Sequence, residues 1–169
     1  MDPAALFITS SRRFLQRSYL PKIERCMDAL SEEELWWRPN DRSNSIGNLV
    51  LHLAGNVRQY IVSGAGGAPD IRMRDEEFAA HEVMTKDDLR TMLRDTLEEV
   101  DGTLARLDAS VLRNSITVQG RELTVLEAIY HAVEHFSMHT GQIIYIAKQL
   151  KHVDLKFYSF DKNVVHRNY

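Results

Sequence analysis

The residues best suited to chemistry are three histidines at four-residue spacing, His131, His135 and His139. The surrounding stretch predicts a helix, and residues four apart on a helix lie one turn apart on the same face. His135 and His139 are then about 6 Å apart along the axis and about 40° apart around it. Both imidazoles can therefore bind one divalent metal ion. His131 lies a further turn back, so we expect it to line the cavity or to support the ligands.

A third ligand should come from a facing helix, and His52 is the strongest candidate. It lies in the apolar stretch 49–54, where a buried histidine is costly unless its nitrogens are satisfied. Three histidines leave coordination positions open for water and substrate, as in catalytic zinc sites. Neutral imidazoles suit Zn, Ni, Fe or Cu, and the spacing does not choose among them. Gln142, three residues after His139, is placed to hydrogen-bond toward the cavity.

The elements that must position these histidines are amphipathic helices. Apolar residues at three- and four-residue steps predict helices over residues 3–30, 45–62, 85–107 and 124–151. We expect Pro21 to kink or break the first helix, because proline removes a backbone donor and clashes with the preceding turn. N-terminal caps are expected at Ser45, Thr85 and Thr124. The pattern predicts an all-α protein built as a four-helix bundle.

Two long connections separate these helices. Residues 68–81 are predicted to be a loop, and the charged run from Arg72 to Glu77 is most simply a solvated connection. Residues 115–124 predict two short extended pieces around Gln119 and Gly120, a small hairpin before the last helix. Both connections are long enough to allow crossovers. The tail from residue 154 to 169 is aromatic, so we expect it to pack on the rest of the protein.

Composition narrows the class of protein. The chain has 169 residues, 44% of them hydrophobic, and a net charge of −3, which predicts a single soluble domain over residues 1–169. Its basic residues are dispersed, which argues against a nucleic-acid surface. No stretch predicts a membrane span or a signal peptide. Cys26 is the single cysteine, which excludes an intramolecular disulfide. We therefore expect a cytoplasmic protein.

Two segments together resemble the DinB-like superfamily of metal-dependent proteins. The first is Asn-Ser-Ile-Gly-Asn-Leu-Val-Leu-His-Leu-Ala-Gly-Asn at residues 44–56, and the second is His-Phe-Ser-Met-His-Thr-Gly-Gln-Ile at residues 135–143. The resemblance covers essentially the whole chain. The ligand pattern of the superfamily falls on His52, His135 and His139. It implies a four-helix bundle that binds Zn or Ni, with Fe or Mn as alternatives, and that forms a homodimer.

Three functions fit these observations. Relatives in the superfamily include thiol S-transferases and a maleylpyruvate isomerase, which implies an enzyme that activates a low-molecular-weight thiol for transfer to an electrophile. A three-histidine ion with open positions suits this reaction, because a bound metal lowers the pKa of a thiol. The alternative is a non-catalytic metal-binding or ligand-binding stress-response protein. The third reading is a plain helical bundle whose histidines are only packed.

Overall fold

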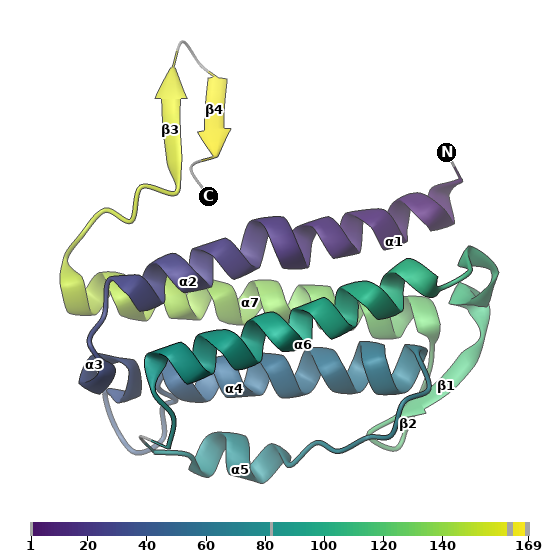
Figure 1. Ribbon diagram of the computed structural model, residues 1–169, viewed down its shortest axis with the longest axis horizontal. Coiled ribbons are helices and arrows are strands. Elements are labelled where there is room, and N and C mark those ends of the chain that lie inside the picture. The colour runs from purple at the N-terminus through teal and green to yellow at the C-terminus, as the bar shows by residue number, and fades with distance from the viewer. Residues whose placement is uncertain (1, 82, 162–163, 168–169) are drawn as a thin grey trace.

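Four long helical rods form the body of the protein (Figure 1), as the sequence predicts. The computed structural model describes residues 2–81, 83–161 and 164–167. The first rod joins α1 (Pro3–Phe14), a π-helical segment (Leu15–Tyr19) and α2 (Leu20–Asp28). The second joins α4 (Ile46–Val57) and a π-helical segment (Arg58–Ala65). The third and fourth rods are α6 (Lys86–Arg106) and α7 (Val125–Lys151).

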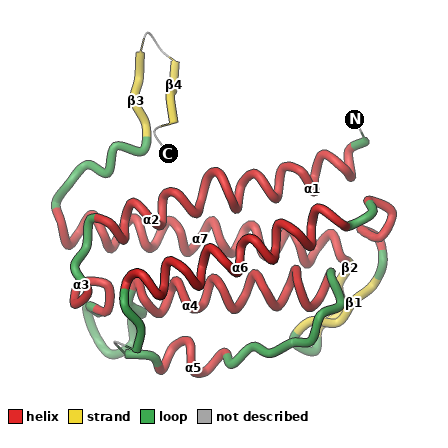
Figure 2. The backbone as a smooth tube through the Cα atoms, in the orientation of Figure 1, coloured by secondary structure: helices red, strands yellow, loops and turns green. Residues whose placement is uncertain are grey.

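Short elements connect the rods and follow the last of them (Figure 2). The connecting helices are α3 (Glu32–Trp36), α5 (Arg74–Ala79) and a 3-10 helix (Ala109–Arg113). The strands form two antiparallel hairpins, β1 (Ser115–Val118) with β2 (Arg121–Thr124), and β3 (Tyr158–Asp161) with β4 (Val164–Arg167). No helix in the described part of the chain is long and apolar enough to cross a membrane.

The order of the rods follows from their two long connections. The chain from the end of α4 returns along the bundle through α5 before α6 begins, so α4 and α6 run in the same direction (Figure 1). This connection is a crossover. The second connection stays at one end of the bundle and contains the β1–β2 hairpin, so α7 runs opposite to α4 and α6. The antiparallel packing of α4 and α7 brings the predicted ligand helices together.

The predicted hairpin before the last helix is confirmed. Ser115 pairs with Thr124, and Val118 pairs with Arg121. The two residues between the strands, Gln119 and Gly120, have φ values of 52° and 71°. Positive φ at both central residues defines the tight turn that matches the twist of paired strands, and glycine adopts it without steric cost.

Of the kink or break expected at Pro21, the break is absent from the first rod. The chain stays helical from Pro3 to Asp28, and the π-helical segment Leu15–Tyr19 lies directly before α2. A π-helical turn shifts the hydrogen-bonding pattern by one residue. Pro21 is the second residue of α2, directly after this turn, so the irregular hydrogen bonding lies where proline removes a backbone donor.

Three predicted caps are present and explain where the rods begin. The side chains of Ser45, Thr85 and Thr124 each accept a hydrogen bond from the backbone nitrogen three residues later. Ser45 and Thr124 form reciprocal capping boxes with Asn48 and Glu127. Such caps satisfy backbone donors that otherwise lack a partner at a helix N-terminus.

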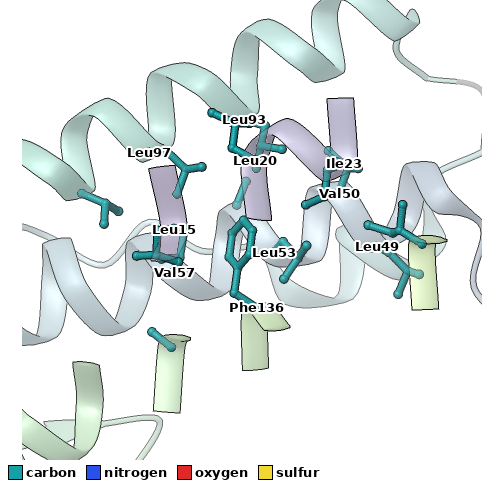
Figure 3. Packing of buried hydrophobic residues seen from close by; sticks show 14 of the residues in the cluster. Leu15, Leu20, Ile23, Leu49, Val50, Leu53, Val57, Leu93, Leu97 and Phe136 are labelled. Atoms are coloured by element: carbon teal, nitrogen blue, oxygen red, sulfur yellow. The ribbon is translucent and has the colours of Figure 1, made fainter. Parts of the chain in front are cut away.

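The core lies where the four rods meet (Figure 3). Every rod contributes fully buried side chains, among them Leu15, Ile23, Leu53, Leu97 and Phe136. The Phe136 ring stacks on Tyr19 with a centroid separation of 6.0 Å. Phe136 follows His135 directly in α7, so the packing of one side chain fixes the helix face that carries the other.

The first residues of the C-terminal tail pack on α2, at the end of the first rod. Leu155 and Phe157 are buried, and Arg25 of α2 donates to the backbone oxygens of Leu155 and Lys156 at 3.2 and 3.0 Å. The β3–β4 hairpin then extends beyond the bundle (Figure 1). The expectation of a packed tail is therefore confirmed for its first residues, whereas the Phe160 side chain and Tyr169 lie outside the described residues.

Candidate metal centre

His52 lies in the middle of α4 on the face that meets α7. His52 is only 6% exposed, and its ring packs on the ring of Phe78 with a centroid separation of 4.7 Å. The capping box of Ser45 and Asn48 fixes the start of α4 two turns earlier. His52 is therefore held by a helix whose position is set at its N-terminus and along its buried face.

The structure brings together His52, His135 and His139. The Nε2 atom of His135 lies 3.1 Å from Nε2 of His52 and 3.2 Å from Nε2 of His139. One ring nitrogen from each residue lies within 4.8 Å of those of the other two. Three nitrogens from two antiparallel helices thus point at a common position.

This arrangement of nitrogens fits a divalent metal ion. Zinc–nitrogen bonds of about 2.0–2.1 Å in a tetrahedron place ligand nitrogens roughly 3.3–3.4 Å apart, close to the two separations in the structure. Nδ1 of His139 contacts Oε1 of Gln142 at 2.7 Å, and Nδ1 of His52 contacts Oε2 of Glu77 at 2.9 Å. Both contacts place a proton on Nδ1 and leave a lone pair on Nε2.

Hydrogen bonding alone does not satisfy these rings. His135 carries at most one Nε2 proton, whereas two lone pairs face it from His52 and His139. Nδ1 of His135 is also buried, without a hydrogen-bond partner among the described residues. Unsatisfied buried polar atoms are costly. A cation at the shared position would accept the Nε2 lone pairs of the three histidines, which hydrogen bonds among the rings do not satisfy.

Burial keeps the paired histidines of α7 neutral, which is the form that binds a metal. Burial is the main cause that lowers the pKa of His135, to about 3, and the nearby histidines lower it further. Burial likewise lowers the pKa of His139, although the hydrogen bond to Gln142 acts in the opposite direction. The uncharged rings can lie together without mutual repulsion.

His131 lies beside the three-nitrogen cluster and is not one of its members. Its ring packs on Tyr60 with a centroid separation of 4.4 Å and on His135 at 5.5 Å. Burial lowers its pKa as well. Glu134, which the helical spacing directs away from the ligand pair, is exposed. His131 therefore connects the ring of His135 on α7 to the ring of Tyr60 on the second rod.

The predicted solvated loop over residues 68–81 is wrong in two respects. Residues 74–79 form helix α5, and the side chains of Arg72 and Glu77 at the two ends of the charged run are buried, whereas residues 73–76 are exposed. The side chain of Glu77 is 9% exposed and that of Arg72 is 3% exposed. Nε and Nη2 of Arg72 donate to the two carboxylate oxygens of Glu77 at 2.7 and 2.8 Å. The pair is buried because Glu77 reaches inward to His52, a contact that spacing within the run does not reveal.

The environment of Glu77 favours its ionised form. Burial opposes ionisation and raises the pKa of the carboxyl group, but hydrogen bonds from Arg72 and His52 outweigh it. The pKa of Glu77 is therefore lowered overall. Together with Arg72, Glu77 also forms part of the wall of a cavity of about 650 Å³ that extends between α4, α5 and α6.

Several solved structures share the fold of this protein. A DinB-like protein from Bacillus cereus superposes with a TM-score of 0.67 at 14% identity, covering 85% of this chain and 90% of its own. A DinB-like protein from Bacillus subtilis has a TM-score of 0.63 at 19% identity, with coverages of 87% and 93%. The fold is therefore DinB-like, as the sequence resemblance implies.

A third similar structure is a mutant of the mycothiol-dependent maleylpyruvate isomerase. Its TM-score is 0.63 at 15% identity, and the match covers 88% of this chain and 67% of that one. None of the curated proteins matches this chain in sequence. The sequence profile of DUF1572, described as a protein of unknown function, matches residues 2–164. The chain belongs to the DUF1572 family.

Proposed function

We propose that this protein is a divalent-metal-dependent enzyme that activates a low-molecular-weight thiol for transfer to an electrophile. The observation that carries the proposal is the convergence of three Nε2 atoms, with separations of 3.1 and 3.2 Å. Zn or Ni is the proposed metal, and the chain is proposed to act as a homodimer. The similar fold of the mycothiol-dependent isomerase supports the choice of a thiol.

The residues of this chain have separate tasks in the proposed reaction. His52, His135 and His139 would hold the ion, and Gln142 orients His139 through its contact with Nδ1. Once bound by these residues, a divalent ion would supply the positive charge that lowers the pKa of a nearby thiol. The thiol proton leaves to solvent, and the sulfur lone pair forms a bond to the electrophilic carbon while the leaving group departs with its electron pair.

The reacting thiol must come from another molecule. The chain has one cysteine, Cys26, and it is fully buried in the core beside Met27. Burial raises the pKa of the Cys26 thiol to about 12, which keeps it in its unreactive protonated form. A small thiol that enters from solvent is consistent with a site whose α7 histidines are half-buried.

A conjugation assay tests the proposal. The zinc-loaded or nickel-loaded protein is mixed with bacillithiol, mycothiol or glutathione and with chlorodinitrobenzene, and thioether formation is followed by absorbance. We expect turnover with at least one thiol, and loss of about 100-fold or more in His52→Ala, since the ion would lose one of its three protein ligands.

Two results would contradict the enzyme proposal. Equal rates for the parent and His52→Ala would show that the histidine cluster takes no part in conjugation. Stoichiometric metal without turnover for any thiol over a broad panel of electrophiles would instead support the non-catalytic metal-binding protein. Glu134→Ala is the matched control, because Glu134 is exposed on the same helix and its loss should leave the rate unchanged.

A further inference from the structure

One side chain of α5, that of Glu77, contacts His52 on the side of the ring that faces away from the other two histidines. Glu77 lies 25 residues after His52 in the chain, and its Oε2 atom contacts Nδ1 of His52 at 2.9 Å. This contact is on the side of the imidazole ring opposite to Nε2, which faces His135. A group bound at Nδ1 determines which nitrogen of the ring carries the proton.

The carboxylate of Glu77 determines the tautomer of His52. An ionised carboxylate only accepts hydrogen bonds, so the 2.9 Å contact requires the proton of His52 on Nδ1. Nη2 of Arg72 also lies 3.1 Å from Nδ1 of His52, and it donates to Oε2 of Glu77 at 2.8 Å. Both donors therefore share one acceptor, and the lone pair of His52 remains on Nε2.

Arg72 holds the carboxylate in a fixed orientation. Its two bonds to Glu77 are bidentate, the geometry that most restricts a carboxylate. The third guanidinium nitrogen, Nη1, donates to Oε1 of Gln59 at 2.8 Å. Gln59 belongs to the same rod as His52, so Arg72 ties the loop before α5 to the helix that carries the histidine.

Gly55 provides the space that this contact requires. A Cβ atom on Gly55 would lie 2.0 Å from Oε1 of Glu77 and 3.1 Å from Nε of Arg72. Any larger residue at position 55 must displace the carboxylate. The backbone of α5 is anchored separately, because Nδ2 of Asn48 donates to the carbonyl oxygens of Glu77 and Ala80 at 2.9 and 2.8 Å.

We propose that Glu77, held by Arg72 and accommodated by Gly55, is a positioning residue that orients His52 for metal binding. The crossover segment thereby becomes part of the metal site although none of its side chains is proposed to touch the ion. The inference rests on the proposed function for the metal itself. Carboxylates behind ligand histidines raise metal affinity by about 10- to 100-fold in other proteins.

The first experiment measures zinc affinity by competition with a chromophoric chelator. We expect Glu77→Ala and Gly55→Ala to bind Zn²⁺ about 10- to 100-fold more weakly than the parent. Glu77→Gln retains an acceptor oxygen and should lose less. Glu76→Ala and Gly102→Ala are the matched controls, because Glu76 is the exposed neighbour of Glu77 and Gly102 lies in α6. Both should bind as the parent does.

Cobalt gives a spectroscopic signature that a purely structural role would not produce. The d–d absorption of bound Co²⁺ depends on ligand geometry. It should change in Glu77→Ala and Gly55→Ala at saturating Co²⁺ and stay unchanged in the controls. If Glu77→Ala fails to fold, Gly55→Ala and Glu77→Gln decide the result.

The second experiment reads the tautomer in metal-free protein, so that it is independent of the proposed function. Nitrogen chemical shifts of the His52 ring are recorded at about pH 8.5, above the ordinary histidine pKa of about 6.5. We expect an Nδ1–H ring in the parent and a mixture of tautomers in Glu77→Ala.

The outcomes separate the two claims. A parent that binds no metal but shows the Nδ1–H ring contradicts the proposed function and leaves the tautomer assignment supported. A parent that binds zinc, with Glu77→Ala and Gly55→Ala equal to it in affinity and in cobalt spectrum, overturns the positioning role. An Nε2–H ring in the metal-free parent also overturns it.

Discussion

Burial has opposite chemical consequences for the histidines and for the cysteine of this protein. It lowers the pKa of His135 to about 3, so the ring stays neutral and can bind a metal. It raises the pKa of Cys26 to about 12, so the thiol stays protonated and does not attack electrophiles. At the level of single residues, the fold therefore keeps the imidazoles in the form that binds a metal and keeps the one thiol of the chain in its unreactive form.

The reactivity of Cys26 gives a pH-dependent prediction. A shift of its pKa from 9.0 to about 12 reduces the thiolate fraction near pH 8 by about 1,000-fold. Native protein should therefore react with a disulfide reagent at least that much more slowly than protein unfolded in denaturant. Because the folded pKa is raised, the stability that this thiol contributes is present below pH 9.0 and is lost as the pH rises toward 12.

One result of this assay would contradict the prediction for Cys26. A native rate within about tenfold of the unfolded rate would mean that Cys26 is accessible as thiolate. Cys26→Ser, which carries no thiol, is the blank for both the native and the unfolded reaction.

The grouping of His52, His135 and His139 was predictable from sequence, whereas the residues behind His52 were not. Spacing of four in a helix fixes the relation of His135 to His139, and an apolar helix implies that His52 faces inward. Glu77 contacts His52 across 25 residues, and it lies in a charged run that has the composition of a solvated loop. Only the three-dimensional path of the crossover reveals that Glu77 and Arg72 are buried as a pair.

At the scale of elements, the start of α4 is fixed by the fit of a glycine against a tryptophan. Gly47 lies in the first turn of α4, and a Cβ atom there would lie 2.8 Å from two ring carbons of Trp36. Trp36 is buried, and its Nε1 donates to the backbone oxygen of Met84 at 3.3 Å. The ring therefore has little freedom to move. By contrast, a Cβ placed on Gly141 in α7 meets no described atom within 4 Å apart from its chain neighbours and the backbone of its own helix.

These two glycines form a matched pair of substitutions. Gly47→Ala should lower the free energy of unfolding by about 1–3 kcal/mol, because it overpacks a rigid contact. Gly141→Ala should raise the free energy of unfolding by about 0.4–1 kcal/mol, since alanine has a higher helix propensity than glycine at an exposed position within a helix. Urea unfolding at equilibrium measures both values. Equal effects of the two substitutions would contradict the packing of Trp36 on α4.

Helix boundaries followed from local signals in the sequence, and the first rod at Pro21 shows the limit of such signals. Ser45, Thr85 and Thr124 carry caps because their side chains satisfy nearby backbone donors, which is a local property. The effect of Pro21 depends on the π-helical turn that precedes it. That turn contacts α7 and α6, and the sequence of one helix does not contain such contacts.

At the scale of the whole molecule, the candidate metal centre links two rods that meet in the core. His52 belongs to α4 and the other two ligands belong to α7, so a bound ion would cross-link antiparallel helices. An ion that binds only the folded state stabilises it by about 4 kcal/mol when its free concentration is 1,000 times its dissociation constant. Metal binding and thermal stability should therefore change together.

The most direct test of the account is the metal content of the protein. Elemental mass spectrometry is applied to protein purified without a histidine tag, beside the triple variant His52→Ala, His135→Ala and His139→Ala. We predict close to one equivalent of a divalent metal in the parent, none in the variant, and a melting temperature that falls on chelation only in the parent. A folded parent that binds no Zn, Ni, Mn or Fe after reloading would contradict a metal site at these three histidines.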